Sequence, residues 1–463
     1  MLQTGLQDIE ADLRAMRKYF DSGTTLPYRF RKEQLQILRS AVSGYEDRLN
    51  AALYQDLKKS PEEIWVTETG FFTAEINKVI RNLKKWMRPR KVPTNLLNLP
   101  SRSYIFSEPL GVVLIIAPWN YPFQLLLAPL IGAIAAGNCV VLKPSEFAPA
   151  TASVLKEMFK ENFPPGYIQL VEGQGSEVIP HLMQEFAFDH IFYTGSTEVG
   201  RIIYREAAEK LIPVTLELGG KSPAIVEEDA DIKIAAKRIA VVKFSNAGQM
   251  CVAPDYVLVH RAVKGKFLKE IELAINSFYP EGAKASRDYG RIINRNQYNR
   301  LLSFLEGENV VSGGETSADD FFIGPTIIDE PDLESPLMQE EIFGPLLPVI
   351  SFEERKTAMD IVQKNKNPLA LYVFTSNKKT ADDWIKKVPF GGGCINNASF
   401  HLLNPNLPFG GRGSSGLGNY HGRFSFDTFS HKKSILKTPV WFDPSIKYPP
   451  YDGKLGLLKR IIR

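Results

Sequence analysis

The sequence has few cysteines, few histidines and little excess charge, and each shortage excludes a class of protein. Its three cysteines, Cys139, Cys251 and Cys394, lie far apart, so neither a disulfide framework nor a cysteine-ligated metal site is indicated. The six histidines show no spacing typical of metal ligands. A formal net charge of +4 over 463 residues gives no basis for binding nucleic acid. Unpaired thiols suit a reducing compartment, which predicts a cytoplasmic protein without a bound metal.

One stretch without any charge, residues 110–142, is long enough to suggest a membrane span. Pro118, Pro122 and Pro129 interrupt it, however, so it is better interpreted as a strand, a loop, a helix and a second strand, all buried. Residues 1–20 mix acids and bases with apolar residues at helical spacing, and therefore lack the apolar core of a secretory signal. No transmembrane segment is predicted.

The order of apolar segments indicates the fold class. Residues 1–90 carry apolar positions every three or four residues, which is typical of helices. From 110 to 216, and again from 217 to 400, short apolar strands alternate with helical stretches. This alternation predicts an α/β protein with two doubly wound α/β domains. Residues 91–109 and 401–463 are predicted to form a small β arm and the C-terminal segment.

Two segments have features of a nucleotide site. Gly195, Ser196 and Gly200 lie between a predicted strand and helix, where free N–H groups can bind a phosphate. Their Gly-x4-Gly spacing differs from the common dinucleotide fingerprint, and by itself it fits an ordinary strand-to-helix turn equally well. Lys143 and Glu146 follow a buried strand, at the end where α/β sheets bind ligands. A surface lysine and a helix-capping glutamate are the alternative interpretation.

Three residues are candidates for a catalytic role. Cys251 follows an apolar, helix-like run and could act as a nucleophile, although a lone cysteine is more often a small buried hydrophobe. Glu217 is flanked by two leucines, so desolvation should raise its pKa and suit it to general-base work, unless it points to solvent. Asn120 could donate to a developing oxyanion, which is worth about 3 kcal/mol, or could satisfy its own turn.

Six segments, in this order along the chain, resemble the motifs of the aldehyde dehydrogenase superfamily: 118–123, 142–146, 193–200, 216–223, 248–251 and 340–345. The run from Pro408 to Gly422 and the tail at 447–450 resemble its class 3 branch, whose members act on fatty and aromatic aldehydes. The resemblance covers nearly the whole chain, and six ordered motifs are far more specific than any one of them.

The resemblance implies a site and a reaction. Cys251 would be the nucleophile, Glu217 the general base and Asn120 an oxyanion donor. Medium- or long-chain aliphatic or aromatic aldehydes would be oxidised to carboxylic acids through a thiohemiacetal and a thioester. The cofactor would be NAD, with NADP as an accepted alternative, bound by Trp119, Lys143, Glu146, Gly195, Ser196, Gly200, Leu218, Gly219, Glu341 and Phe343. Residues 1–90 with 110–216 would bind the dinucleotide, 217–400 would be the catalytic domain, and the arm would join a homodimer.

Two other functions remain as alternatives at this point. A CoA-acylating aldehyde dehydrogenase would pass the acyl group to CoA instead of water, and a cysteine esterase or hydrolase would work without any redox step. The last residues, 455–463, are too short to span a bilayer. They would either lie on a membrane surface as a peripheral contact or pack on a partner subunit.

Overall fold

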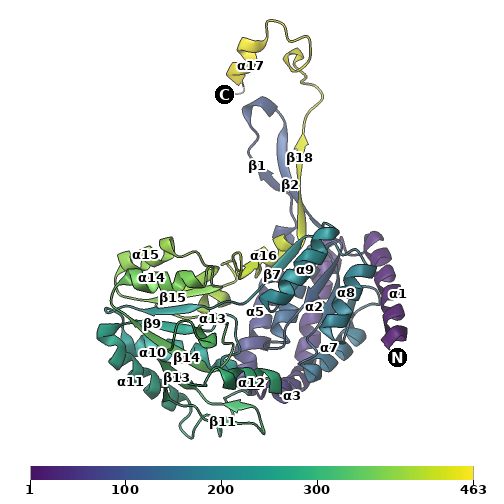
Figure 1. Ribbon diagram of the computed structural model, residues 1–463. Helices are drawn as coiled ribbons and strands as arrows, with labels where there is room; N and C mark the ends of the chain where they lie inside the picture. Colours follow the sequence, from purple (N-terminus) through teal and green to yellow (C-terminus); the bar gives the residue numbers. More distant parts are fainter. Residues whose placement is uncertain (1, 462–463) are drawn as a thin grey trace.

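The computed structural model describes residues 2–461, which form two α/β units with a narrow arm rising beside them (Figure 1). The chain begins with helices, as the apolar spacing of the first 90 residues predicts. The core of the first unit is formed in part by apolar faces of these helices. On those faces the side chains of Leu35, Leu38 and Leu49 are completely buried. These N-terminal elements are α1 (Leu2–Asp21), α2 (Tyr28–Gly44), α3 (Glu46–Leu57), α4 (Pro61–Ile64), the π-helical turn η1 (Trp65–Thr69) and α5 (Gly70–Trp86).

The first unit is built on a six-stranded sheet of order β17-β7-β6-β3-β4-β5, parallel except for β17. Its strands are β3 (Val112–Ile116), β4 (Cys139–Lys143), β5 (Ile168–Leu170), β6 (His190–Thr194), β7 (Val214–Glu217) and β17 (Gly416–Leu417). Its helices are α6 (Gln124–Ala136), α7 (Pro149–Asn162), α8 (Gly175–Glu185) and α9 (Thr197–Glu209).

The charge-free stretch 110–142 folds as β3, α6 and β4, which confirms the interpretation as buried strand, helix and strand. Every residue of α6 is buried, since the helix lies between the sheet and α2, α5 and the C-terminal α16 (Arg423–Thr428). None of the helices that the structure describes combines the length and apolarity that crossing a bilayer requires.

The second unit has a seven-stranded sheet of order β10-β13-β14-β9-β8-β15-β16, parallel except for β10. Helices cover both faces, α10 and α11 on one side and α14 and α15 on the other (Figure 1). The prediction of two doubly wound α/β units is therefore confirmed. The strands are β8 (Pro223–Val226), β9 (Tyr256–His260), β10 (Val310–Ser312), β13 (Thr326–Asp329), β14 (Leu346–Phe352), β15 (Ala370–Phe374) and β16 (Gly392–Ile395). The helices are α10 (Ile232–Phe244), α11 (Arg261–Phe278), α12 (Arg295–Ser303), α13 (Pro336–Gln339), α14 (Arg355–Lys364) and α15 (Lys378–Lys387), and β11 (Thr316–Ser317) pairs with β12 (Phe322–Ile323).

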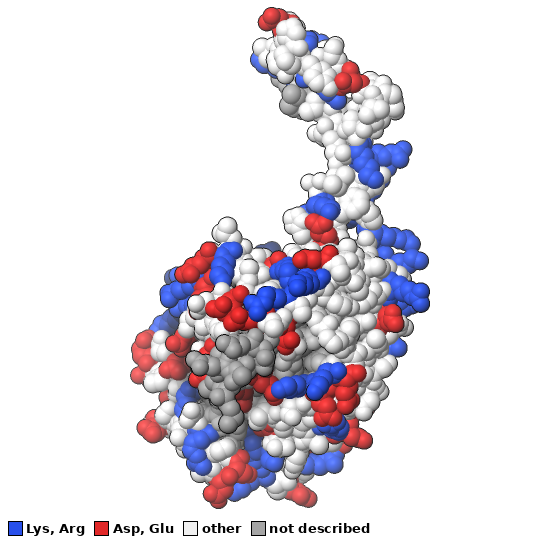
Figure 2. All heavy atoms as spheres, turned by 90° about the vertical axis from the view of Figure 1, so that its right-hand side faces the viewer, with Lys and Arg blue, Asp and Glu red and all other residues white. Residues whose placement is uncertain are grey.

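The arm is a three-stranded antiparallel sheet of β1 (Arg90–Val92), β2 (Arg102–Pro109) and β18 (Ser430–Lys437). It confirms the expected small β arm, and the tail with η5 (Ser445–Lys447) and α17 (Leu455–Ile461) continues beyond it. Figure 2 shows arm and tail standing clear of the body, with Lys and Arg side chains gathered along them. Residues 401–463 do more than build the arm, because β17 also extends the first sheet.

Asn138, in the turn between α6 and β4, connects three parts of the first unit. Its Oδ1 accepts a hydrogen bond from the Gly111 N–H (2.9 Å), and its Nδ2 donates to the Ala133 and Phe429 carbonyls (3.2 and 2.9 Å). The side chain is completely buried. It therefore holds the start of β3, the end of α6 and the start of β18 together.

Replacing this residue, Asn138→Ala, should lower the free energy of unfolding by about 2–4 kcal/mol, because buried backbone groups lose their partners. Chemical denaturation measures the loss. Asn276→Ala, at an exposed position of α11, is the matched control and should change stability by less than about 0.5 kcal/mol. Equal effects of the two substitutions would contradict the connecting role of Asn138.

Candidate active site

Cys251 lies in a turn between α10 and β9, after a short helix η3 (Ser245–Gly248). Asn246, Ala247 and Gly248 all have positive φ (50°, 51° and 74°), so the chain reverses sharply before the cysteine. At position 248 only glycine fits, since a Cβ would lie 2.2 Å from the Gly344 carbonyl oxygen. The turn thus packs directly on the segment that carries Glu341 and Phe343.

Cys251 opens into a cavity of about 210 Å³ that is lined mainly by apolar and aromatic side chains. The Glu217 side chain lines the same cavity, so the structure brings the predicted nucleophile and the predicted base together. The walls come from η1 and α5, the loop before α6, the end of α10, the Cys251 turn, the helical turn η4 (Phe400–Leu403) and the C-terminal segment. Among the lining residues are Val66, Phe71, Tyr121, Leu125, Met250, Phe400, Leu402, Phe409, Tyr420 and His421.

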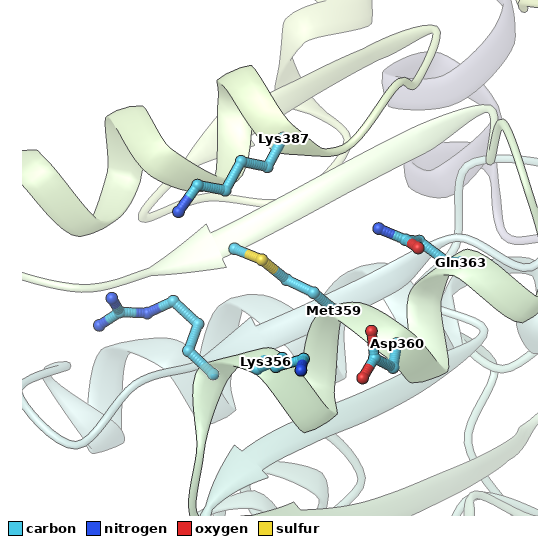
Figure 3. Close-up of a pocket in the computed structure, with 6 residues that line it drawn as sticks. Lys356, Met359, Asp360, Gln363 and Lys387 are labelled. Carbon is cyan, nitrogen blue, oxygen red and sulfur yellow. The ribbon is translucent and has the colours of Figure 1, made fainter.

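A larger hollow of about 570 Å³ lies between α14 and α15, with Lys387 facing Met359 across it (Figure 3). Most of its lining side chains are exposed and polar or charged, and it contains none of the predicted site residues. The chemistry that Cys251 and Glu217 offer belongs to the apolar cavity.

Glu217 ends β7 and is buried, and neither of its carboxylate oxygens has a hydrogen-bond partner among residues 2–461. Burial raises its pKa well above the usual 4.5, as the flanking leucines predict. Burial therefore favours the neutral form of the carboxyl group, and once ionised it is a stronger base than an exposed glutamate.

The Cys251 thiol is also held in its neutral form. Burial raises its pKa to about 12, and the carboxyl groups of Glu341 and Glu217 add to the effect. This differs from the low-pKa environment of a preformed thiolate, which requires nearby positive charge. A carboxylate base must consequently take the thiol proton before or during attack.

Asn120, in the loop after β3, is buried beside the Cys251 turn. Its Nδ2 donates to the Gln249 carbonyl (3.0 Å), two residues before the cysteine, and Nδ2 carries a second hydrogen. Its Oδ1 has no hydrogen-bond partner in the described part of the chain. The Asn120 carbonyl accepts from Lys59 Nζ (3.1 Å) and from Asn246 Nδ2 (2.9 Å). Sequence reasoning missed both of these donors.

Glu341 and Phe343 reach the site from the segment after α13. Burial, with Asp255 nearby, raises the pKa of Glu341 to about 8. A Cβ on Gly219 would lie 1.9 Å from Glu341 Oε2, so glycine is required where these segments meet. The Phe343 ring stands edge-on to Trp119, with 5.3 Å between the centroids.

A buried ion pair, also missed in the sequence, fixes this segment. Lys221 Nζ pairs with Asp255 and donates to the carbonyls of Leu337 (2.9 Å) and Glu340 (2.7 Å). Asp255 Oδ1 accepts from the Ile342 N–H (2.9 Å). Hydrogen bonds on both sides of Glu341 therefore hold it beside the cavity.

The predicted cofactor residues of the first unit all lie at one edge of its sheet. In a parallel sheet the carboxyl ends of neighbouring strands meet there, and these are the ends of β3, β4, β6 and β7. The residues placed at that edge by those strand ends are Trp119, Asn120, Lys143, Glu146, Gly195, Ser196, Glu217, Leu218 and Gly219. Gly200 lies in the first turns of α9, where a Cβ would meet Leu218 at 2.6 Å.

The groups at this edge fit a dinucleotide. Ser196 caps α9, accepting from the Val199 N–H (3.4 Å), and the first N–H groups of that helix are available to a phosphate. Lys143 Nζ pairs with Glu146 Oε2 (3.4 Å), and Glu146 Oε1 accepts from the Gly175 N–H (2.9 Å). Burial alone would raise the Glu146 pKa, but backbone hydrogen bonds and Lys143 lower it, so the carboxylate is charged and can accept ribose hydroxyls.

The raised pKa of Glu217 has a consequence for stability. Above pH 4.5 the unfolded chain ionises at this residue while the folded chain keeps the proton, so the folded state becomes less favoured as the pH rises. Glu217→Gln removes this effect. The variant should therefore gain stability relative to the wild type as the pH rises, by at most about 1.4 kcal/mol per pH unit. Denaturation at several pH values measures it; Glu209→Gln, exposed at the end of α9, should leave the wild-type pH dependence unchanged.

Comparison with known proteins places the chain in a family. The model of the aldehyde dehydrogenase family matches residues 2–435. A 4,4'-diaponeurosporen-aldehyde dehydrogenase of Staphylococcus aureus is 44% identical, over 98% of this chain and 99% of that protein. A dimeric NADP-preferring aldehyde dehydrogenase of Canis lupus familiaris is 41% identical, over 97% of this chain and 99% of that protein.

Among solved structures, the substrate-bound state of Staphylococcus aureus AldH superposes with a TM-score of 0.95 at 44% identity, covering 98% of this chain and 99% of that one. The fold expected from the sequence is confirmed, and so is the resemblance to the class 3 branch, because family 3 aldehyde dehydrogenases match over nearly the whole chain at 41–43% identity. The chain belongs to the aldehyde dehydrogenase family and is an NAD(P)-dependent oxidoreductase of that family.

Proposed function

We propose that this aldehyde dehydrogenase oxidises apolar aldehydes to carboxylic acids, with Cys251 as the nucleophile and Glu217 as the base. The observation that carries the assignment is that both side chains line one apolar cavity, beside the sheet edge where the strand ends meet. A buried carboxyl group with a raised pKa beside a thiol is an arrangement expected of an active site.

Cys251, Asn120 and Glu217 have different roles in the proposed reaction. A carboxylate base takes the thiol proton as the Cys251 sulfur attacks the aldehyde carbon, and the carbonyl oxygen becomes negative. The second Nδ2 hydrogen of Asn120 and the Cys251 backbone N–H donate to that oxygen, each for about 3 kcal/mol of barrier. A bound NAD or NADP would supply the acceptor for the hydride that leaves the former aldehyde carbon, so that a thioester remains on Cys251. Glu217, ionised, takes a proton from the water that hydrolyses the thioester, and its raised pKa suits this step.

For the cofactor we assign three regions of the site. Gly195, Ser196 and Gly200 would hold the phosphates at the N-terminus of α9. Lys143 and Glu146 would hold the adenosine ribose. The ring end would lie near the cavity, against Trp119, Leu218, Gly219, Glu341 and Phe343. The charged Glu146 carboxylate would oppose a 2′-phosphate, which favours NAD while leaving NADP as a weaker alternative.

We further propose a homodimer of cytoplasmic chains joined through the arm. The relative from Canis lupus familiaris is described as dimeric. The arm and tail expose large apolar side chains, among them Leu96, Val440 and Trp441, and such surfaces need a partner. Pelleting with lipid vesicles distinguishes this arrangement from a tail that lies on a membrane surface.

Cys251→Ala tests the nucleophile. The rate at which the variant forms reduced cofactor in the presence of aldehyde should fall by at least about 10³-fold, because no thioester can form. Its affinity for NAD, measured by fluorescence titration, should stay within about twofold of the wild type. Cys394→Ala, which removes a thiol outside the cavity lining, should keep activity. Turnover by the Cys251 variant comparable to the wild type would contradict the assignment.

The apolar lining of the cavity predicts how rate depends on substrate length. Each methylene that enters the cavity is worth about 0.8 kcal/mol, so kcat/KM should rise about threefold to fourfold per carbon across a series of straight-chain aldehydes. The rise should stop once the chain extends beyond the cavity. Leu402→Gln, in the lining, should flatten the series, whereas Leu407→Gln, outside it, should not. A flat wild-type series would exclude an apolar-chain substrate.

A further inference from the structure

Lys59 and Glu68 form an ion pair inside the first unit, with 2.8 Å between Nζ and Oε1. Both side chains are completely buried. Such pairs persist only when further hydrogen bonds satisfy the two charges, because removal from water costs several kcal/mol per ion. The partners of these further hydrogen bonds therefore show which segment of the chain the ion pair stabilises.

All of these bonds go to the loop that carries Asn120. Lys59 Nζ donates to the Asn120 carbonyl (3.1 Å) and lies 3.9 Å from the centroid of the Tyr121 ring. Glu68 Oε2 accepts from the Phe123 and Gln124 N–H groups (3.1 and 3.2 Å). The lysine thus contacts the middle of the loop, and the glutamate contacts its end, where α6 begins.

From Asn120 the contacts continue to the cysteine turn. The Asn120 carbonyl also accepts from Asn246 Nδ2 (2.9 Å). Asn246 Nδ2 and Asn120 Nδ2 both donate to the Gln249 carbonyl (3.1 and 3.0 Å). A shift of the Asn120 backbone would therefore change the position of its amide relative to Cys251.

Glu68 belongs to η1, a π-helical turn, and its neighbours Val66 and Thr67 line the cavity. π-helical turns are frequently found at functional sites. Here the turn places the Glu68 side chain in the protein interior, while Val66 and Thr67 line the cavity.

We propose that Lys59 and Glu68 are positioning residues that hold the Asn120 amide in place for the oxyanion formed at Cys251. This inference rests on the role proposed above for Asn120.

Two reagents that attack the same sulfur separate positioning from general damage. Iodoacetamide alkylates the sulfur: the thiolate attacks its saturated carbon, a C–S bond forms, iodide leaves, and no oxyanion appears. p-Nitrophenyl acetate is attacked at a carbonyl: a tetrahedral oxyanion forms, p-nitrophenolate leaves, and an acetyl thioester remains. Loss of a well-placed oxyanion donor should slow only the second reaction.

The test variant is the double substitution Lys59→Met with Glu68→Gln, which removes both charges together and leaves no unpaired ion. Peptide mass analysis follows modification of Cys251 alone, since Cys394 is also partly exposed. We expect acetylation to slow by about tenfold or more, with alkylation within about twofold of the wild type. The exposed pair Arg48 and Glu157, which joins α3 to α7, provides the matched control as Arg48→Met with Glu157→Gln, and both rates should stay unchanged.

Asn120→Ala identifies which proposal fails. It should slow acetylation selectively, and combining it with the double substitution should add little further loss, because the pair acts through Asn120. Equal slowing of both reactions by the double variant, or no slowing of either while Asn120→Ala slows acetylation, would overturn the positioning role and leave the role of Asn120 intact. An Asn120→Ala protein with unchanged acetylation would instead refute the proposed function of that residue. Should the double variant fail to fold, Lys59→Arg and Glu68→Gln, tested singly, must show the same selective loss.

Discussion

The parallel hydrogen-bond ladder of β7, β6, β3 and β4 is the constraint on which the site depends. The ladder aligns four strand ends that come from widely separated parts of the chain. Each end is followed by residues that the family motifs contain, so one sheet edge collects the Asn120 loop, the Lys143 and Glu146 pair, the Gly195 turn and Glu217. Without the register of this sheet, the same residues would have no common location.

The second constraint is that the apolar active site excludes water. An apolar cavity excludes water from the thioester and favours an apolar substrate, yet it also penalises every charge placed near it. Two features of the structure reduce this penalty. Burial favours the neutral forms of Glu217 and Cys251, whereas hydrogen bonds to the backbone close the ion pairs of Lys59 with Glu68 and of Lys221 with Asp255. The neutral groups face the cavity, and the paired charges support the segments around it.

The sequence alone predicts the elements and the chemically reactive residues better than it predicts their supports. Three prolines in the charge-free stretch were sufficient to identify a buried strand, helix and strand, because proline and strand length are local signals. Cys251, Glu217 and Asn120 belong to recognisable motifs. Lys59 and Glu68 lie more than fifty positions before Asn120, in a helical region whose periodicity explains them as ordinary surface charges. Their burial depends on a π-helical turn and on long-range packing, and neither leaves a local pattern. The antiparallel β17 was missed for the same reason, since two residues are too short for a periodic signal.

The proton balance of the site shows why the placement of Asn120 should matter. Burial raises the pKa of Cys251 to about 12, above that of the nearby Glu341 carboxyl group at about 8, so passing the thiol proton to a carboxylate costs free energy. Two well-placed oxyanion donors, each worth about 3 kcal/mol, offset this cost once the sulfur has attacked a carbonyl. Proton loss and attack on a carbonyl are therefore most favourable when they occur together, whereas a reagent that forms no oxyanion gains nothing from these donors. A donor that moved by a fraction of its hydrogen-bond length would remove that compensation, because hydrogen bonds weaken steeply with distance and angle. A buried ion pair that contacts neither the sulfur nor the cavity thus influences the rate of the first chemical step.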